Sequence, residues 1–321
     1  MELSNLNEKA EILSKKIAEA KNEIAKEVIG QQEMIEKIII GTVTGGHILL
    51  EGVPGLAKSR TVSAVANVIG AEFKRIQFTP DLLPADLIGT EIYNHNSGEF
   101  VTKKGPLFSN IILADEINRA PAKVQSALLE AMQEKQVTIG GKTYKLEEPF
   151  LVLATQNPIE QEGTYPLPEA QQDRFMMKLK VTYSTREEEK KIIELVTGEH
   201  GLISEVSSKL SREEINEIRE YVKKIYVDER VKNYVLDLVF KTREPSQYIA
   251  CGASPRAGIN MVLAAKGKAL VEGRGYVTPD DVKYVAKDVL RHRILLTYEA
   301  EAEEINSDMI IEEMLKNIII P

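Results

Sequence analysis

Residues 52–59 read GVPGLAKS, that is Gly52, Val53, Pro54, Gly55, Leu56, Ala57, Lys58 and Ser59. This stretch follows an apolar run at 48–50 and precedes a helical pattern that extends from Lys58 to about Ile69. Glycines let backbone N–H groups close around phosphates, and the amino terminus of the next helix adds partial positive charge. In such a loop Lys58 reaches the β- and γ-phosphates, and the Ser59 hydroxyl binds Mg²⁺. The stretch therefore predicts a phosphate-binding loop between a strand and a helix.

Ala57 departs from the general pattern of these loops, which has a glycine directly before the lysine. A methyl group is tolerated at this position where the residue has a negative, helical φ. We therefore expect a negative φ at Ala57.

Short apolar runs alternate with helical segments in the first half of the chain, at 47–50, 73–78, 111–114 and 150–154. Strands separated by helices imply βαβ units and a mainly parallel sheet covered on both faces. Two segments break the alternation. Residues 90–102 have turn chemistry at 94–98, and residues 136–146 alternate around Gly140 and Gly141. We expect both to be β-hairpins inserted into an α/β core.

Beyond about Ser184 the strand signals stop, and helices are expected at 187–196, 213–225, 228–241, 255–272 and 279–293. Ser211 and Glu214 form a capping box, while Ser254 and Thr278 each precede a proline suited to a first helical position. We expect three units: an N-terminal helix at 1–27, an α/β nucleotide-binding domain at 28–184 and a smaller all-α domain at 185–321.

Composition limits the function classes. The net charge of -8 disfavours general nucleic-acid binding, which usually leaves a basic footprint. Cys251 is the single cysteine, which excludes an internal disulfide and fits a reducing compartment; we expect it in a loop without a special role. The longest nearly uncharged run, 38–50, is too short to span a bilayer, and no signal-peptide pattern opens the sequence. These features predict a cytoplasmic protein without membrane insertion.

Polar residues follow two of the expected strands. The run 111–114 ends in Asp115 and Glu116, where the aspartate can hold the Mg²⁺ shell beside Ser59 and the glutamate can polarise an attacking water. Asn157 follows the run 150–154, at the sheet edge where parallel strands line a ligand crevice. It can orient the water there, although Asn157 and Pro158 are also typical of a simple turn.

Two arginines extend the candidate set. Arg174 also fits an ordinary ion-paired surface arginine. Arg256 lies in the first turn of an expected helix, where positive charge opposes the helix dipole by roughly 0.3–1 kcal/mol. That position makes sense if Arg256 faces an anion.

The ordered set resembles an AAA+ ATPase and, more closely, the MoxR group of that superfamily. The likeness covers about 28–293 and rests on five motifs: GVPGLAKS at 52–59, DEINRAP at 115–121, ATQNP at 154–158, LPEAQQDRF at 167–175 and ASPRA at 253–257. The group ordinarily has alanine at the position of Ala57.

The resemblance implies roles that spacing alone does not give. Residues 52–59 match Walker A, Asp115 and Glu116 match Walker B, and Asn157 matches sensor 1. Arg174 matches the arginine finger that completes a neighbouring subunit's ATP site, and Arg256 matches sensor 2 in a helical lid. The resemblance also implies that Val28, Ile29, Gly30 and Gln31 contact adenine and that Arg60, directly after the loop, binds the nucleotide. The hairpins resemble the helix-2 and pre-sensor-1 inserts, while Arg119 lies in a group motif without an assigned role.

The resemblance implies that the chain binds ATP or ADP with Mg²⁺ and forms a homo-oligomeric ring, usually a hexamer. It also implies that the ring remodels a client protein or inserts a metal cofactor into it. Members often work with proteins that carry von Willebrand factor A domains. Three alternatives stay open: the ATPase subunit of a chelatase, a nucleic-acid motor, and a nucleotide-binding scaffold without hydrolysis. Net acidity disfavours the motor, and the presence of Glu116 disfavours the scaffold.

Overall fold

A parallel sheet forms the centre of the molecule in the computed structural model, which describes residues 3–53, 55–96, 98–158, 163–197 and 206–321. Its five strands are ordered β2-β5-β8-β1-β9, and every neighbouring pair is parallel. Their bounds are β1 Ile48–Glu51, β2 Phe73–Gln77, β5 Ile111–Asp115, β8 Leu151–Gln156 and β9 Met177–Lys180. The expected fold class, a P-loop α/β core with two hairpins and a helical domain, is confirmed.

The edge strand β9 was missed by the sequence reasoning. It has only four residues and alternates lysine with apolar side chains, as MKLK. Met177 and Leu179 are buried, whereas Lys178 is half-buried and Lys180 is exposed, so one face of β9 stays polar and no continuous apolar run marks it. Its register sets Leu50 opposite Leu179, so β9 extends the same edge of the sheet that carries the phosphate loop.

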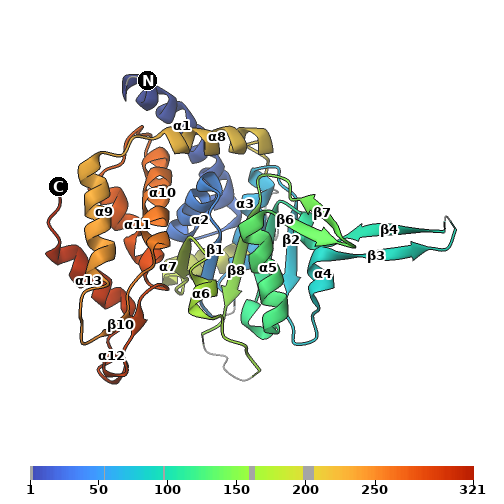
Figure 1. The fold of residues 1–321 in the computed structure, drawn as a ribbon. Coiled ribbons are helices and arrows are strands. Elements are labelled where there is room, and N and C mark those ends of the chain that lie inside the picture. Colours follow the sequence, from blue (N-terminus) through green and yellow to red (C-terminus); the bar gives the residue numbers. More distant parts are fainter. Residues whose placement is uncertain (1–2, 54, 97, 159–162, 198–205) are drawn as a thin grey trace.

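Helices cover both faces of the sheet (Figure 1). Alternate strand residues enter two separate cores. Leu50 and Leu113 pack in the core that includes α1 Leu3–Glu27, α2 Gln32–Thr44 and α3 Lys58–Val68. Leu49 and Ile112 pack in the core that includes α5 Ala122–Glu134 and the short α4 Pro84–Ile88. The sheet is thus buried on both sides, as a parallel sheet requires.

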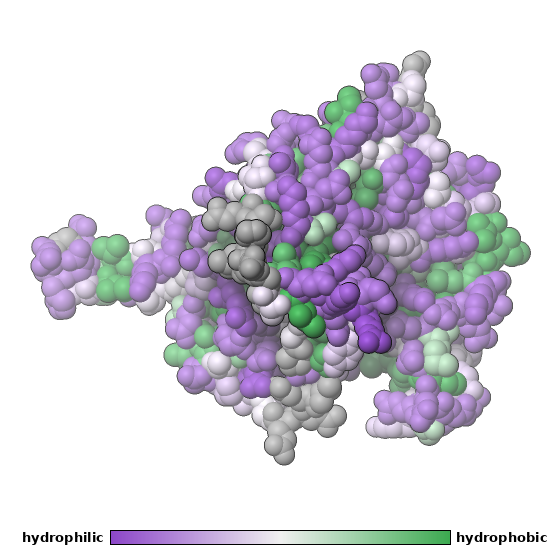
Figure 2. Space-filling view, turned by 180° about the vertical axis from the view of Figure 1, so that it is seen from behind, coloured by the Kyte–Doolittle hydropathy of each residue, from purple (hydrophilic) through white to green (hydrophobic). Residues whose placement is uncertain are grey.

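Both expected hairpins are present. One pairs β3 Gly89–Asn94 with β4 Glu99–Lys104 and projects far from the body, and the other pairs β6 Gln136–Ile139 with β7 Lys142–Lys145 (Figure 1). The Thr102 and Tyr144 hydroxyls share a hydrogen bond of 3.0 Å, which ties the base of the first hairpin to the second. From behind, the projecting hairpin carries a band of hydrophobic surface (Figure 2); Phe100 is 68% exposed.

The C-terminal part is mainly helical and lies to the left of the sheet in Figure 1. Its helices are α7 Arg186–Thr197, α8 Arg212–Lys224, α9 Glu229–Lys241, α10 Pro255–Val271, α11 Pro279–Leu290, α12 Tyr298–Ala302 and α13 Ser307–Asn317. The Ser211–Glu214 capping box is confirmed. The expectation of no strands beyond Ser184 is wrong, since β10 Ile249–Cys251 pairs with β11 Leu295–Leu296. Strands this short carry no readable periodicity. Cys251 therefore lies in a strand and not in a loop.

Short elements complete the chain: α6 Glu169–Gln172 and the 3₁₀ turns η1 Pro106–Phe108 and η2 Ile117–Arg119. Helix α1 is tied to the C-terminal part at both of its ends, because Ser207 donates to Glu23 at its carboxyl end and the Gly275 N–H donates to Asn7 near its start. The boundaries at 27/28 and 184/185 stay predictions. Across the described residues, helices are too short or too polar to cross a bilayer.

Candidate nucleotide-binding site

The loop at 52–59 connects β1 to α3, which begins at Lys58. Its start lies tightly against the residue that follows β9, because a Cβ at Gly52 would meet the Val181 carbonyl oxygen at 2.7 Å. Lys58 Nζ donates to the Gly52 carbonyl oxygen at 2.6 Å, and burial lowers the pKa of Lys58 against the opposing effect of two nearby acids. A partly buried lysine without a full counter-charge suits an anionic ligand. Pro54 lies outside the described residues.

The expected negative φ at Ala57 is wrong. Ala57 has φ 55° and ψ 17°, in the left-handed region, and forms the N-cap of α3. Its carbonyl oxygen accepts from the Thr61 N–H at 2.9 Å and the Thr61 hydroxyl at 3.0 Å. The sharp entry into α3 therefore needs this conformation, and alanine bears a steric cost that glycine would avoid.

A pocket of about 380 Å³ lies above the loop, with residues from three further strands in its wall. Its lining is Gly55, Leu56, Ala57, Lys58, Ser59, Arg60, Arg75, Asp115, Glu116, Thr155 and Asn157. The sheet register explains this convergence, since Gln77 lies opposite Asp115 and Leu50 lies opposite Thr155 at the carboxyl ends of parallel strands. The structure thus brings together the loop, the acidic pair and Asn157.

Asp115 is held on both carboxylate oxygens. The Thr155 hydroxyl donates to Oδ1 at 2.6 Å, and Arg75 donates to Oδ2 through Nε at 2.9 Å and Nη2 at 2.5 Å. Thr155 is 1% exposed, so its hydroxyl has little choice of partner. This carboxylate is fully hydrogen-bonded within the chain, as a partly buried charge requires.

Glu116 has φ 56° and ψ 51°, a left-handed conformation unusual for a side chain of this size. Its N–H donates to the Thr155 hydroxyl at 2.8 Å, and its carboxylate accepts from Gln77 Nε2 at 2.7 Å and pairs with Arg119 Nε at 3.0 Å. One hydroxyl thus links the backbone of Glu116 to the carboxylate of Asp115. Backbone strain held by its surroundings clusters at functional sites.

The donor set suits Mg²⁺ better than a metal held by the protein alone. Ser59 and Asp115 offer oxygen ligands in the same pocket, and the described residues contain no group of three or more His, Cys, Asp or Glu side chains arranged for a metal. Mg²⁺ usually takes one or two protein oxygens and completes its shell with phosphates and water. The two residues therefore fit a metal that arrives with a nucleotide.

Arg174 and Arg256 lie outside this pocket, beside Asp173. Ser254 Oγ donates to the two Asp173 carboxylate oxygens at 3.0 and 2.9 Å, and Arg256 Nη1 lies 3.4 Å from one of them. Arg293, 1% exposed, donates to the same carboxylate at 2.7 Å. Arg256 therefore does face an anion, but one from its own chain. Among the described residues, none forms an ion pair or side-chain hydrogen bond with Arg174.

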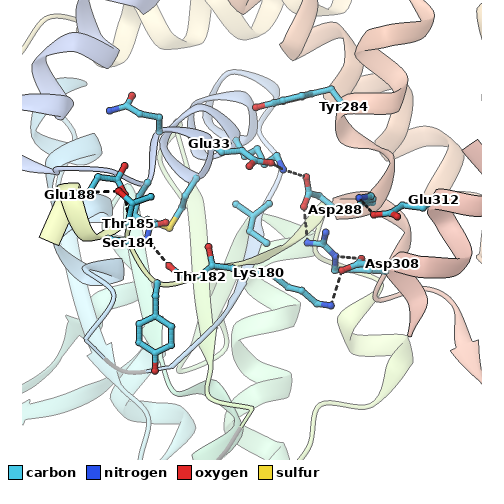
Figure 3. Close-up of a pocket in the computed structure, with 18 of the residues that line it drawn as sticks. Glu33, Lys180, Thr182, Ser184, Thr185, Glu188, Tyr284, Asp288, Asp308 and Glu312 are labelled. Carbon is cyan, nitrogen blue, oxygen red and sulfur yellow. Dashed lines mark hydrogen bonds and ion pairs between the residues drawn. The ribbon is translucent and has the colours of Figure 1, made fainter. Parts of the chain in front are cut away.

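The adenine segment expected at 28–31 borders a second and larger cleft of about 670 Å³, lined by α2, α11, α13 and residues 179–185 (Figure 3). Gln31 lines it and donates to the Thr182 carbonyl oxygen at 2.8 Å. Val28 is buried in the core, Ile29 is half-buried, and Gly30 packs on Glu188. Val28 and Gly30 can therefore contact a ligand through backbone atoms only.

The floor of this cleft is a chain of ion pairs that joins the two parts of the molecule. Lys37 and Arg291 pair with Asp288 at 2.5 and 2.7 Å, and Arg291 and Lys180 pair with Asp308 at 2.8 and 2.7 Å. Figure 3 shows Lys180, Asp288 and Asp308 converging from β9, α11 and α13. Burial raises the pKa of Asp288, which its two cations oppose. Arg60 lies apart from this cleft, at the phosphate pocket, 3.4 Å from Glu27.

Sequence reasoning missed Arg75, Gln77 and Thr155. Each lies on a strand that ends at the pocket, so the edge rule that selected Asp115 and Asn157 could have selected them. The available signal was the charged and amide side chains in FKRIQ of the edge strand β2.

Comparisons with known proteins agree with this geometry. A family model described as "ATPase family associated with various cellular activities (AAA)" matches residues 47–177, and one for the AAA lid domain matches 243–314. The chaperone MoxR1 of Mycobacterium tuberculosis is 48% identical over 307 residues, 93% of this chain and 81% of that protein. Protein MoxR of Methylorubrum extorquens is 30% identical over 91% of this chain and 92% of its own. A crystal structure from Cytophaga hutchinsonii, provisionally classed as an ATPase, has a TM-score of 0.92 and 53% identity over 100% of this chain and 99% of its own.

Proposed function

The chain belongs to the MoxR family of AAA+ ATPases, and on that premise we propose that it hydrolyses ATP with Mg²⁺ at the pocket above residues 52–59. The observation that carries the proposal is the convergence of Lys58, Ser59, Asp115, Glu116 and Asn157 on one pocket of about 380 Å³. Each side chain has the chemistry that phosphoryl transfer needs, and the reaction depends mostly on positioning and charge stabilisation.

In this proposal Lys58 and the backbone of the loop bind the β- and γ-phosphates, and Ser59 and Asp115 hold the metal. Bound Mg²⁺ would neutralise developing charge on the phosphate oxygens. Glu116 accepts a proton from the attacking water, and Asn157 orients that water. The strained backbone of Glu116, fixed by the Thr155 hydroxyl, supports a positioned base and argues against a nucleotide-binding scaffold without hydrolysis.

We further propose that the site is completed by a neighbouring subunit. Arg174 and Arg256 lie together around Asp173, outside the phosphate pocket of their own chain. Two arginines at one surface position can serve the γ-phosphate of an adjacent copy, as an arginine finger in trans does. This arrangement favours a ring, for which six subunits is the family expectation, and extends the trans role from Arg174 to Arg256.

The remaining assignments also stay proposals. Residues 28–31 would contact adenine through backbone groups and Gln31, with Arg60 near the phosphates. The units 1–27, 28–184 and 185–321 would be the N-terminal helix, the nucleotide-binding domain and the lid. The work of the ring would be chaperone-like remodelling, maturation or metal-cofactor insertion in a client, with a von Willebrand factor A domain protein as a possible adaptor. A cytoplasmic location without nucleic-acid partners rests on composition alone.

The decisive experiment follows ATPase rate per subunit against protein concentration for the wild type, Glu116→Gln and Arg174→Ala. The rate should rise with concentration in the wild type. Glu116→Gln should retain ATP binding and lose turnover by at least about 100-fold, since general-base catalysis contributes roughly that factor or more. Arg174→Ala should lose a similar factor, which an arginine finger can supply.

The control is Lys190→Ala, which removes one positive charge from the exposed surface of α7. Its rate should match the wild type. A wild-type rate that is independent of concentration and unchanged by Arg174→Ala would exclude the role in trans. ATP binding without any wild-type turnover would exclude hydrolysis.

A further inference from the structure

Arg75 forms an ion pair with Asp115, the carboxylate that binds Mg²⁺ in the proposed function. Two of its guanidinium N–H groups donate to the same oxygen, Asp115 Oδ2, at 2.9 and 2.5 Å. Arg75 comes from β2, the edge strand next to β5, and its side chain is 54% exposed while that of Asp115 is 13% exposed. A cation whose side chain is more than half exposed therefore covers a nearly buried anion.

The chain has a physical need for such a cation. Oδ1 of Asp115 accepts from the Thr155 hydroxyl, which leaves Oδ2 as the oxygen that Arg75 contacts at the pocket. Lys58 donates to the Gly52 carbonyl oxygen and Arg60 lies beside Glu27, so these two cations contact other oxygens, whereas Arg75 pairs with Asp115 itself. A partly buried carboxylate without a partner is costly, and Arg75 supplies the missing charge.

Metal and guanidinium cannot share this oxygen at close range. A divalent ion at Asp115 Oδ2 would lie within a few ångströms of a guanidinium that donates to the same atom, and like charges at that distance repel. The two cations therefore compete. Because Arg75 is more than half exposed, its side chain can swing into solvent or toward another anion without unfolding the strand.

We propose that Arg75 is a counterion that holds Asp115 while no metal is bound and gives up this contact when Mg²⁺ binds with nucleotide. The inference rests on the proposed function of the pocket. It makes Arg75 a positioning residue that keeps the metal carboxylate oriented, at the expense of metal affinity. Arg75 also donates to Gln77 Oε1 at 3.3 Å, so its departure from Asp115 releases that amide as well.

The test measures metal affinity separately from catalysis. Purified protein saturated with ADP is titrated with Mn²⁺, and free Mn²⁺ is followed by electron paramagnetic resonance. Arg75→Ala should bind Mn²⁺ about fivefold more tightly than the wild type, the factor that corresponds to about 1 kcal/mol for one partly exposed ion pair. Arg75→Lys keeps the charge but loses the paired donation, and should fall between the two.

The matched control is Lys74→Ala, on the same strand, which removes one charge from an exposed side chain that does not line the pocket. Its Mn²⁺ affinity should equal that of the wild type. A second readout guards against altered folding: the rise in Tm on addition of Mg²⁺ and ADP should be larger for Arg75→Ala than for the wild type.

Each outcome of the Mn²⁺ titration either supports or overturns the role of Arg75. Tighter Mn²⁺ binding in Arg75→Ala alone supports the inference, and unchanged or weaker binding overturns it while the proposed function stands. An equal gain in Lys74→Ala also overturns it, because general electrostatics would then explain the effect. If the wild type binds neither ADP nor Mn²⁺, the proposed function fails and the inference fails with it.

Discussion

The buried histidine that precedes β1 should make this protein lose stability in mild acid. His47 is 7% exposed, and its Nδ1 accepts from the Val152 N–H at 2.9 Å while Nε2 faces the Met132 carbonyl oxygen at 3.2 Å. These partners fix one neutral tautomer, protonated at Nε2. A second proton on Nδ1 would point at the Val152 N–H and break that hydrogen bond. Burial accordingly lowers the pKa of His47 to about 4.

The sign and size of the effect follow from linkage. The folded-state pKa lies below the ordinary value, so the unfolded chain binds the proton more tightly, and stability is lost as pH falls from about 6.5 toward 4. A pKa of about 4 against about 6.5 removes about 2 kcal/mol from the free energy of unfolding between about pH 7.5 and about pH 5. Glu23 and Glu36, with pKa values of about 2, lose their contribution only at lower pH.

Urea unfolding of dilute, nucleotide-free protein, followed by circular dichroism at both pH values, measures this difference. His47→Gln offers an amide with a donor and an acceptor but no titration in this range, so the pH-dependent loss should shrink by about 2 kcal/mol whatever its baseline stability. His292 is also buried with its pKa lowered by burial, and should account for part of the remaining loss.

The matched control is His95→Gln on the exposed hairpin, which should keep the wild-type pH dependence. Equal pH dependence in the wild type and His47→Gln would refute the assignment of a depressed pKa to His47.

Three further changes test other parts of the structure. Asp173→Ala leaves the buried Arg293 without its carboxylate and should lower the free energy of unfolding, measured in urea, by about 3–5 kcal/mol. Asp173→Asn should cause a smaller loss, and a loss below about 1 kcal/mol for Asp173→Ala would contradict a buried pair. Ala57→Gly removes left-handed strain and should raise thermal stability by about 0.5–1 kcal/mol after the entropy of glycine is counted, whereas destabilisation would indicate a negative φ. Gly140→Ala would place a Cβ 2.0 Å from the Glu91 carboxylate carbon, so that this side chain must turn away and its contact between the hairpins is lost. Faster amide exchange at the base of β3 should follow, with Gly141→Ala, where a Cβ meets no atom within 4 Å, as the control.

The fold was predictable because its signals are local and strong. Apolar runs of four to six residues gave four strands of the sheet, and capping residues such as Ser211 fixed helix starts to within one or two positions. The strand β9 escaped because an edge strand needs only one buried face, and β10 and β11 escaped because two or three residues carry no period. Those failures come from tertiary pairing, which no local pattern records.

The site was predictable wherever a motif ends a strand and unpredictable wherever a side chain's partner lies on another strand. Asp115 and Glu116 were found from their sequence position, but Thr155 and Arg75 matter through hydrogen bonds set by the sheet register. The backbone of Ala57 shows the same limit: the residue type favours negative φ, and the entry angle of α3 overrides that preference.

Asp173 connects the two arginines that the phosphate pocket of this chain lacks. Its carboxylate accepts from Ser254 and pairs with Arg256, both at the start of α10, and from the opposite side it holds the buried Arg293 at the end of the lid core. Arg174 is the next residue along the chain, so its backbone position depends on the same carboxylate. We therefore expect a change in the lid that shifts Arg293 or Arg256 to move Arg174 as well. If the two arginines contact a neighbour's nucleotide, a change in the position of one subunit's lid changes the position of these arginines in the ATP site of the next subunit.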